Sequence, residues 1–290
     1  MAVLMCRPDF FGIEYEINPW MKVANAVNRD LAIEQWEGIV DAYKSVGEKV
    51  ELLEPIPGLP DMVFTANGGL IWGNHFVRSN MHHPERQGEE PYFEQRMRDL
   101  GFEIDTTDKS FSCEGAGDGM FVGSTLFFGS GFRTQPEAHK LVADILDVEH
   151  VSLQLVNDHF YHLDTCFCPL NDDTVMIAPM ALTPESVDLV RARVRNVIEV
   201  DGETARGFAC NALPVGDLVI SSTAIDDVKD ELRAAGFGVM GLPVTEFKKS
   251  GGGVRCLTLP LALGPVRQHR ADTSEHWLKR SAQRGVNPLA

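Results

Sequence analysis

The sequence predicts one α/β domain built as a closed ring of five similar units, and three observations lead to this prediction. Five amphipathic helix patterns follow one another along the 290 residues, and each is succeeded by a strand-like segment and then by a hairpin pattern. The strand-like segments begin near residues 49, 102, 151, 197 and 237, at intervals of 53, 49, 46 and 40 residues. Such a period, roughly 40–50 residues, is typical of repeat architectures.

The helices are predicted from apolar residues at helical spacing and from the glycines that end them. The first helix, over residues 25–45, carries Leu31, Trp36 and Ile39 on one face and ends before Gly47. Further helices are predicted over residues 91–100, 136–146, 184–194 and 225–235, with Gly101 and Gly236 ending the second and the fifth.

The strands are predicted from short apolar runs between turn signals. The segments that follow the helices cover residues 49–53, 102–104, 151–156, 197–200 and 237–240. The hairpin strands cover residues 62–65, 70–72 and 75–77 in the first unit, 120–122 and 126–128 in the second, 163–168 and 175–178 in the third, 208–213 and 218–221 in the fourth, and 254–259 in the fifth.

The N-terminal segment Met1–Cys6 is predicted as a strand without a partner of its own, and the fifth hairpin lacks one strand. Pairing the two would close the five units into a propeller with a central channel. An open, doubly wound sheet is the competing architecture, but a hairpin in every unit argues against a purely parallel sheet. No linker-like or low-complexity segment divides the chain, so residues 1–290 are expected to form a single domain.

The composition is typical of a globular protein with an acidic surface. The formal net charge is −16, from 26 basic and 42 acidic residues. This charge disfavours non-specific binding to nucleic acid or to an anionic membrane and suits a cationic small molecule, although solubility alone also explains it. No basic-then-apolar signal begins the chain and no apolar run reaches the roughly 18 residues of a membrane span, so a cytoplasmic location is expected.

Six cysteines in a chain of this length do not form a disulfide scaffold. Cys166 and Cys168 share a predicted strand with His162, which hints at a metal site. A structural zinc site needs a second pair of ligands at suitable spacing, and the sequence shows no such pair. No metal is therefore expected.

Polar side chains that could act in catalysis or binding occur once in each unit, at or just before the hairpin strands. Equivalent positions of a closed ring converge on its axis, so a carboxylate, a histidine with a second carboxylate, and a thiol are expected to meet there. The segments that carry them are Asp61–Asn67, Cys113–Asp118, Tyr161–Asp164, Cys210–Asn211 and Gly251–Cys256.

Each of these segments also has an ordinary structural explanation when it is taken alone. The glycines at 251–253 allow close approach of a bound molecule and present Cys256 as a candidate nucleophile, but a buried apolar cysteine after a glycine turn is the commoner case. His162 and Asp164 would share one face of a predicted strand, although an isolated histidine of this kind is usually structural. The run Gly115–Gly119 precedes a strand rather than a helix, so it is not a phosphate cradle.

Five motifs spread over nearly the whole chain nevertheless form a specific combination: Phe64–Asn67, Glu114-x-x-x-Asp118, Gly131–Thr134, His162-x-Asp164 and Gly252–Cys256. This combination resembles the guanidine-modifying superfamily of five-bladed α/β-propellers, the penteins. The superfamily includes arginine deiminase, dimethylarginine dimethylaminohydrolase, arginine:glycine amidinotransferase and arginine dihydrolase. The segment Glu14–Met21, together with Asn67, is most similar to arginine dihydrolase. Deiminases and dimethylargininases usually carry an acidic residue near Asn67, where this chain has an amide.

The resemblance implies a single catalytic propeller in which Cys256, as a thiolate, attacks the guanidinium carbon and expels ammonia. His162 would protonate the leaving nitrogen and then activate water against the thiouronium intermediate, with Glu114 orienting or charge-balancing it. The implied substrate-binding residues are Asp164 for the guanidinium, Arg133 and Arg86 for the α-carboxylate, Asn18 and Asn67 at the pocket wall, and Asp118. No metal or organic cofactor is implied.

The function that the resemblance implies is hydrolysis of L-arginine to ornithine, two molecules of ammonia and carbon dioxide. One alternative is a relative that acts once, a deiminase or a dimethylargininase, and gives citrulline. Another is a non-catalytic propeller that binds a macromolecule, and the presence of Cys256, His162 and Glu114 argues against it. The sequence does not report the oligomeric state, so a homo-oligomer remains open.

Overall fold

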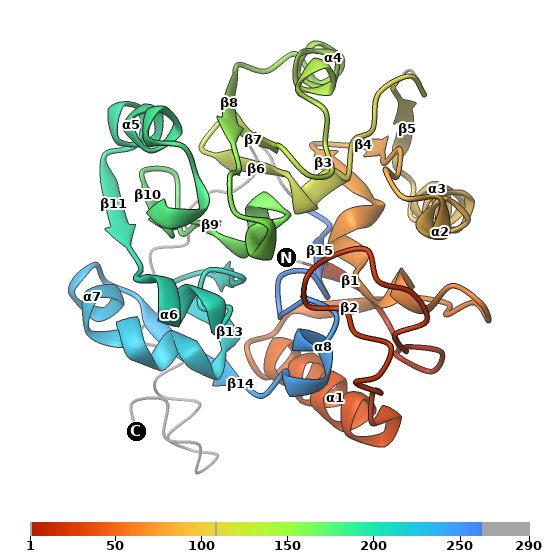
Figure 1. Ribbon diagram of the computed structural model, residues 1–290. Coiled ribbons are helices and arrows are strands. Elements are labelled where there is room, and N and C mark those ends of the chain that lie inside the picture. The colour runs from red at the N-terminus through yellow and green to blue at the C-terminus, as the bar shows by residue number, and fades with distance from the viewer. Residues whose placement is uncertain (1, 108, 263–290) are drawn as a thin grey trace.

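The described residues form five small sheets arranged in a ring around one axis, with the longer helices outside them (Figure 1). The computed structural model describes residues 2–107 and 109–262. The rest of the predicted domain, including residues 263–290, lies outside the described residues. The ring confirms the predicted five-bladed α/β propeller.

Every sheet has three strands: an antiparallel pair, and a third strand parallel to the middle one. In ring order the sheets are β15 (Leu259–Pro260), β1 (Ala2–Cys6) and β2 (Lys49–Leu53); β3 (Gly69–Trp72), β4 (His75–Arg78) and β5 (Glu103–Thr106); β6 (Gly119–Val122), β7 (Thr125–Ser130) and β8 (His150–Gln154); β9 (Phe167–Pro169), β10 (Thr174–Ile177) and β11 (Asn196–Glu199); and β12 (Leu213–Val215), β13 (Leu218–Ser222) and β14 (Gly238–Leu242).

The N-terminal strand closes the ring, as predicted. β1 pairs with β15 in antiparallel register, with Val3 opposite Pro260, and with β2 in parallel register, with Val3 opposite Val50. Four of the sheets combine a hairpin with the strand that follows the next helix along the chain, and in the sheet that closes the ring β15 and β1 take the place of the hairpin. The sheets are therefore offset by half a unit from the predicted repeat. This exchange of strands links every unit to its neighbour.

The helices are α1 (Arg29–Ser45), α2 (Pro84–Gln87), α3 (Glu90–Asp99), α4 (Pro136–Leu146), α5 (Pro184–Arg193), α6 (Gly202–Arg206), α7 (Lys229–Ala234) and α8 (Thr245–Lys248). Helices α1, α3, α4, α5 and α7 connect each middle strand to its parallel partner across the outside of the ring (Figure 1), whereas α6 and α8 lie between the strands of successive sheets. The first helix begins at Arg29 rather than at residue 25, because the Asn28 side chain accepts the backbone N–H of Leu31 and caps the helix there. Gly47, Gly101 and Gly236 follow helix ends with φ of 85°, 89° and 92°, which confirms the predicted ends.

The hydrophobic core lies between these helices and the sheets. Trp36 and Ile39 of α1 are buried in one cluster with Val3 and Met5 of β1 and with Phe247 of α8. Burying a large apolar side chain contributes about 1.5–3 kcal/mol, so this packing anchors the sheets firmly around the axis. Among the described helices, none is both long and apolar enough to cross a membrane.

The inner ends of the hairpins differ from the prediction in one repeated way. Where a first hairpin strand was predicted, the chain makes a tight turn before the strand begins, so most of the strands predicted over residues 62–65, 163–168, 208–213 and 254–259 are wrong. Three of these inner turns are 3-10 helices over Thr65–Gly68, Gly115–Gly117 and Leu163–Thr165, and the other two are hydrogen-bonded turns within residues 207–211 and 254–257. Apolar composition predicted burial correctly, but the buried backbone satisfies its polar groups by local turns instead of a ladder.

The fifth predicted helix, over residues 225–235, also divides into two elements. A 3-10 helix spans Thr223–Val228, and the α-helix α7 follows it.

Candidate active site

The five inner turns meet at the axis and carry the polar side chains that the repeat pattern predicts there. Glycines permit their close approach: a Cβ on Gly115 would lie 2.5 Å from the backbone of Gly69, and one on Gly117 would lie 2.4 Å from Nδ2 of Asn67. Side chains at either glycine would push the turns apart, so these positions require glycine.

Cys256 lies on the inner turn before β15, not at the start of a strand, and 2% of its surface is exposed. Asn211 holds it from two directions: Nδ2 donates to Sγ at 3.0 Å, and Oδ1 accepts the backbone N–H of Cys256 at 3.2 Å. The sulfur donates to Oδ2 of Asp164 at 3.2 Å. Burial, and then the charge of Asp164, raise the pKa of Cys256 well above its usual value. In this structure the residue is therefore a thiol rather than the implied thiolate.

His162 and Glu114 form a buried pair, with Nε2 of His162 2.7 Å from Oε2 of Glu114. Arg133 donates to the same oxygen at 3.3 Å, and the backbone N–H of His82 donates to Oε1 at 3.1 Å. Although burial acts in the opposite direction, Arg133 and the hydrogen bond of His162 lower the pKa of Glu114 well below its usual value. Glu114 is thus an ionised acceptor, so Nε2 of His162 carries a proton toward it and Nδ1 points to the other side of the ring.

Asp118 is fully buried and is not part of the pocket wall, and its role in substrate binding stays a prediction. Its Oδ1 accepts the backbone N–H of Leu163 at 3.0 Å, and this bond fixes the turn between His162 and Asp164. Burial raises the pKa of Asp118 to about 6, against the lowering by His162 and Thr134. The turn also corrects the predicted strand: His162 precedes a 3-10 helix that contains Asp164, so the two do not share one strand face.

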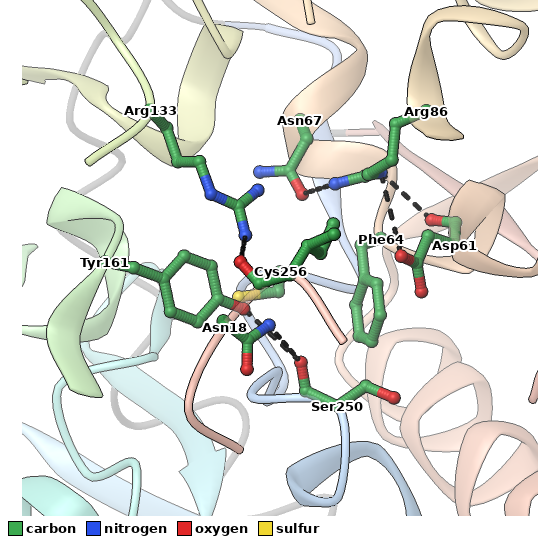
Figure 2. A pocket seen from close by; sticks show the side chains of 10 residues that line it. Asn18, Asp61, Phe64, Asn67, Arg86, Arg133, Tyr161, Ser250 and Cys256 are labelled. Carbon is green, nitrogen blue, oxygen red and sulfur yellow. Dashed lines mark hydrogen bonds and ion pairs between the residues drawn. The ribbon is translucent and has the colours of Figure 1, made fainter. Parts of the chain in front are cut away.

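A small pocket opens beside these residues (Figure 2). The pocket is lined by Ile17, Asn18, Asp61, Phe64, Asn67, Arg86, Arg133, Tyr161, Ser250 and Cys256. The cavity is about 10 Å³, room for about one water molecule. His162, Glu114 and Asp164 lie one contact further in, against Asn67, Arg133 and Cys256 respectively.

The two arginines of the pocket are held in different ways. Arg133 lies over the ring of Tyr161, 4.7 Å from its centroid, and donates to Glu114 at 3.3 Å and to the carbonyl of Ile17 at 3.0 Å. Arg86 forms a two-pronged ion pair with Glu89, through Nε at 2.9 Å and Nη2 at 2.8 Å. Arg133 therefore has more of its guanidinium available for a substrate carboxylate than Arg86 does.

The two predicted pocket asparagines are both found in the wall. Nδ2 of Asn18 donates to the carbonyl of Ser250 at 3.1 Å, and this bond joins the N-terminal loop to the glycine-rich turn. Oδ1 of Asn67 accepts a hydrogen bond from Arg86 at 2.8 Å, and its Nδ2 lies 3.5 Å from Nδ1 of His162.

Several further site residues were not assigned a role from the sequence. Asn211 and Asp61 lie in segments that the repeat pattern had marked, but the pattern did not show that Asn211 binds the cysteine or that Asp61 lines the pocket. Asp61 is 3% exposed and its Oδ1 has no hydrogen-bond partner in the described residues. No sequence pattern indicated that Glu89 is buried near the site, because a glutamate before a helix usually faces solvent.

No group of histidine, cysteine or acidic residues in the described part of the chain is arranged to hold a metal ion. Cys166 and Cys168 instead donate to the backbone carbonyls of Leu163 and Ala212, and both lie in the core.

The site combines a thiol, an imidazole with one free nitrogen, and several buried carboxylates beside one pocket. A thiol can attack a planar carbon, the imidazole can move protons to and from the groups that leave and enter, and the carboxylates suit a planar cation. On a five-bladed propeller, this set of groups defines the guanidine-modifying class of penteins.

Comparison with known proteins gives the family. A family model described as "N,N dimethylarginine dimethylhydrolase, eukaryotic" matches residues 7–263. The chain therefore belongs to this family, and the predicted superfamily is confirmed.

Three relatives illustrate the similarity. The bifunctional arginine dihydrolase/ornithine cyclodeaminase ArgZ of Synechocystis sp. is 42% identical over 89% of this chain, which spans 37% of the length of ArgZ. An N(G),N(G)-dimethylarginine dimethylaminohydrolase of Mycobacterium tuberculosis is 39% identical over 89% of this chain and 84% of the relative. The crystal structure of the N-terminal domain of ArgZ, as a cysteine-to-serine variant bound to substrate, matches with a TM-score of 0.87 and 40% identity, over 91% of this chain and 98% of that domain.

Proposed function

We propose that the protein hydrolyses L-arginine to ornithine, two molecules of ammonia and carbon dioxide through a covalent intermediate on Cys256. The observation that carries the proposal is the amide of Asn67 beside Nδ1 of His162, in a pocket that also contains Cys256. The similarity to ArgZ, whose name includes arginine dihydrolase, and to its substrate-bound N-terminal domain supports it.

The charges around the pocket suit the two ends of arginine. Oδ1 of Asp164 is buried beside Cys256 without a hydrogen-bond partner in the described residues, and a guanidinium would supply one. At the other end, Arg133 offers donors to the α-carboxylate. Oδ1 of Asp61 is a buried acceptor in the pocket wall and suits the α-ammonium group.

Substrate binding would itself activate the cysteine. In this structure burial and the charge of Asp164 keep the proton on Cys256. A guanidinium cation placed against Asp164 offsets that charge and stabilises a thiolate, so the pKa of the thiol falls when the electrophile arrives. Nδ1 of His162 would take up the proton that the thiol releases.

The first half of the reaction then makes and breaks one bond at the guanidinium carbon. Sγ of Cys256 bonds to that carbon, and the tetrahedral adduct expels ammonia after His162 protonates the leaving nitrogen. The imidazole next removes a proton from water, which adds to the thiouronium carbon. The thiolate leaves, and citrulline is formed.

The second half repeats these steps on the neutral urea group of citrulline. Attack by Cys256 expels the second ammonia and leaves a thiocarbamate, whose hydrolysis gives a carbamate that breaks down to ornithine and carbon dioxide. A carboxylate at position 67 would offer only acceptors to citrulline, whereas the Asn67 amide offers a donor to the urea oxygen. Asn67 is thus the residue that we propose keeps citrulline seated for a second attack.

A one-step reaction that ends at citrulline is the second candidate, because the family model and the M. tuberculosis relative carry dimethylarginine dimethylaminohydrolase names. Incubation with L-arginine and quantification of ornithine, citrulline and ammonia separates the two. The proposal expects two ammonia per arginine, with little free citrulline. Stoichiometric citrulline from the wild-type protein would instead establish the one-step reaction.

The variant Asn67→Asp sharpens this test. It should raise the citrulline fraction at least about tenfold while retaining the first step, because the lost donor matters only to the neutral product. An unchanged product ratio would remove Asn67 from this role.

We further propose that one propeller domain carries the whole reaction without a metal or organic cofactor, and that it acts in the cytoplasm on a small molecule rather than on nucleic acid or membrane. All six cysteines are free, which suits a reducing compartment. A homo-oligomer is compatible with the proposal, and size measurement in solution tests it.

A further inference from the structure

Glu89 is a fully buried carboxylate outside the pocket wall, on the residue before α3. Its two oxygens accept from Nε and Nη2 of Arg86 at 2.9 and 2.8 Å, which is a bidentate pair. Its exposed fraction is 0% and that of Arg86 is 3%. The geometry leaves the Arg86 guanidinium one orientation, because both its plane and its position are fixed.

That orientation directs the remaining nitrogen of Arg86 at Asn67. Nη1 donates to Oδ1 of Asn67 at 2.8 Å, as Figure 2 shows, while Nη2 also donates to the carbonyl of Asp61 at 3.1 Å. A guanidinium only donates hydrogen bonds, so the atom of the Asn67 amide that faces it must be the oxygen. The amide NH₂ must then face the other way.

The opposite side of the amide is the reaction centre. Nδ2 of Asn67 lies 3.5 Å from Nδ1 of His162, the nitrogen left free by the bond to Glu114. Without the donor from Arg86, a half-turn of the amide would place its oxygen there at little cost. The amide would then present an acceptor to the urea oxygen of citrulline, as a carboxylate does.

We propose that Glu89 is a positioning residue which, through Arg86, fixes the Asn67 amide with its donor toward the reaction centre and so sets the share of citrulline that undergoes the second hydrolysis. This inference rests on the proposed function of Asn67. Glu89 touches neither substrate nor reacting atoms, so its effect is on the fate of the neutral intermediate.

The neighbouring residue provides a matched control. Glu90 is 5% exposed, and its carboxylate pairs with Arg78 and accepts the backbone N–H of Met81 at 2.9 Å. It bonds to no residue of the pocket wall. Glu89→Gln and Glu90→Gln thus make the same chemical change at adjacent buried positions, and each removes the charge opposite one arginine.

The experiment measures the ratio of citrulline to ornithine released from L-arginine by the full-length wild-type protein and the two variants, together with kcat/KM on added citrulline. Glu89→Gln should raise the ratio at least fivefold and lower kcat/KM on citrulline by the same order, while Glu90→Gln leaves both within twofold of wild type. A product ratio is internal to each sample, so a lower folded fraction does not change it. Equal ratios in all three proteins, or equal rises in both variants, would overturn the inference.

Two further outcomes are distinguishable. If Glu89→Gln does not fold, Glu89→Asp is measured in its place. It keeps the charge but withdraws it by one methylene, so a smaller rise, of at least twofold, is expected, and an unchanged ratio again overturns the inference. If wild type itself releases citrulline stoichiometrically, the proposed double hydrolysis fails and the role of Glu89 fails with it. Normal ornithine release with an unchanged ratio in Glu89→Gln refutes the role of Glu89 alone.

Discussion

Two ion pairs of nearly equal length show how differently the axis and the periphery of the ring use charge. At the axis, His162 and Glu114 lie 2.7 Å apart with at most 1% of either side chain exposed. On the outside of α4, Lys140 and Asp144 lie 2.6 Å apart with 73% and 61% exposed. The buried pair has a high desolvation cost and a strong electrostatic attraction, whereas the attraction in the exposed pair is screened by water. Distance alone therefore does not rank these contacts.

The same contrast extends to single carboxylates. Burial raises the pKa of Asp61, Asp118 and Asp164 around the axis, so their ionised forms are destabilising in the folded protein. Such groups are retained where a bound cation offsets their charge or where they hold a turn in place. The buried carboxylates at the axis thus lower the stability of the fold in exchange for the chemistry of the site, and the periphery provides the stable frame.

The strongest test of this contrast is Cys256→Ser. Turnover should fall at least about 10⁴-fold, because the serine hydroxyl is a far weaker nucleophile in a site built around a thiol. The free energy of unfolding should change by less than about 1 kcal/mol, since the hydroxyl can keep the bonds to Asn211 and Asp164. Steady-state kinetics and urea unfolding measure the two quantities, and full activity would eliminate the covalent mechanism.

Labelling with iodoacetamide extends this test to the free enzyme. Cys256 borders the pocket, whereas Cys166 and Cys168 lie in the core, so Cys256 should react faster than either. Mass spectrometry of the labelled peptides gives the order. Equal rates for the three cysteines would contradict the access to Cys256 that the pocket provides.

The next largest effect is expected for Arg133→Ala. If Arg133 binds the substrate carboxylate, KM for L-arginine should rise about 10- to 100-fold, the equivalent of about 1.5–3 kcal/mol for a charge-assisted hydrogen bond. Agmatine lacks that carboxylate, so its KM should change much less. Because Arg133 also pairs with Glu114, any fall in kcat common to both substrates reports that second contact. Equal changes in KM would show that Arg133 is structural.

The sequence predicted the frame of the ring more completely than its centre. Helical spacing, glycine helix ends and the unpartnered N-terminal strand were sufficient for the five units and their closure, because each depends on local pattern. The sequence predicts strands where three of the inner turns lie, within residues 163–165, 207–211 and 254–257, because burial gives Leu163 and Val254 the apolar neighbours of a strand whatever their backbone does. The backbone geometry of these segments is decided by the convergence of five turns at the axis, which is a tertiary contact and not a local pattern.

The site was predictable to the extent that its residues recur in the repeat. Cys256, His162 and Glu114 fall at equivalent positions, and the structure brings them to one place. The two-pronged bond between Glu89 and Arg86 has no such signal, because it joins two residues outside the repeat positions. Asp118 belongs to a recognisable motif, and the structure adds that its Oδ1 accepts the backbone N–H of Leu163.

The variant Asp118→Asn tests the cost of burying a carboxylate at the axis, because that cost makes the free energy of unfolding depend on pH. Burial raises the pKa of Asp118 in the folded protein to about 6, above its ordinary value of 3.8. The stability it contributes is therefore fully present below about pH 3.8 and is lost as the pH rises through about 6. Asparagine keeps the acceptor for Leu163 without the charge, so relative to wild type the variant should gain about 2 kcal/mol between pH 4.5 and 7.5. Urea unfolding at both pH values measures the gain. If the difference in free energy of unfolding between variant and wild type does not vary with pH, the pKa of Asp118 is not raised in the folded protein.

The smallest effect is expected at the periphery, for Lys140→Ala. The Lys140–Asp144 pair spans one turn of α4 in contact with water, and such pairs contribute about 0.3–0.5 kcal/mol. Alanine also has the higher helix propensity, which offsets part of that loss. The free energy of unfolding should therefore fall by less than about 0.5 kcal/mol, and kinetics with L-arginine should be unchanged. A loss above about 1 kcal/mol in urea unfolding at low salt would mean that exposed pairs stabilise the frame. Addition of 0.5 M salt, roughly, should then abolish most of that loss, because exposed charges are screened within a few ångströms. A loss that persists in salt would instead assign it to packing of the lysine stem on α4.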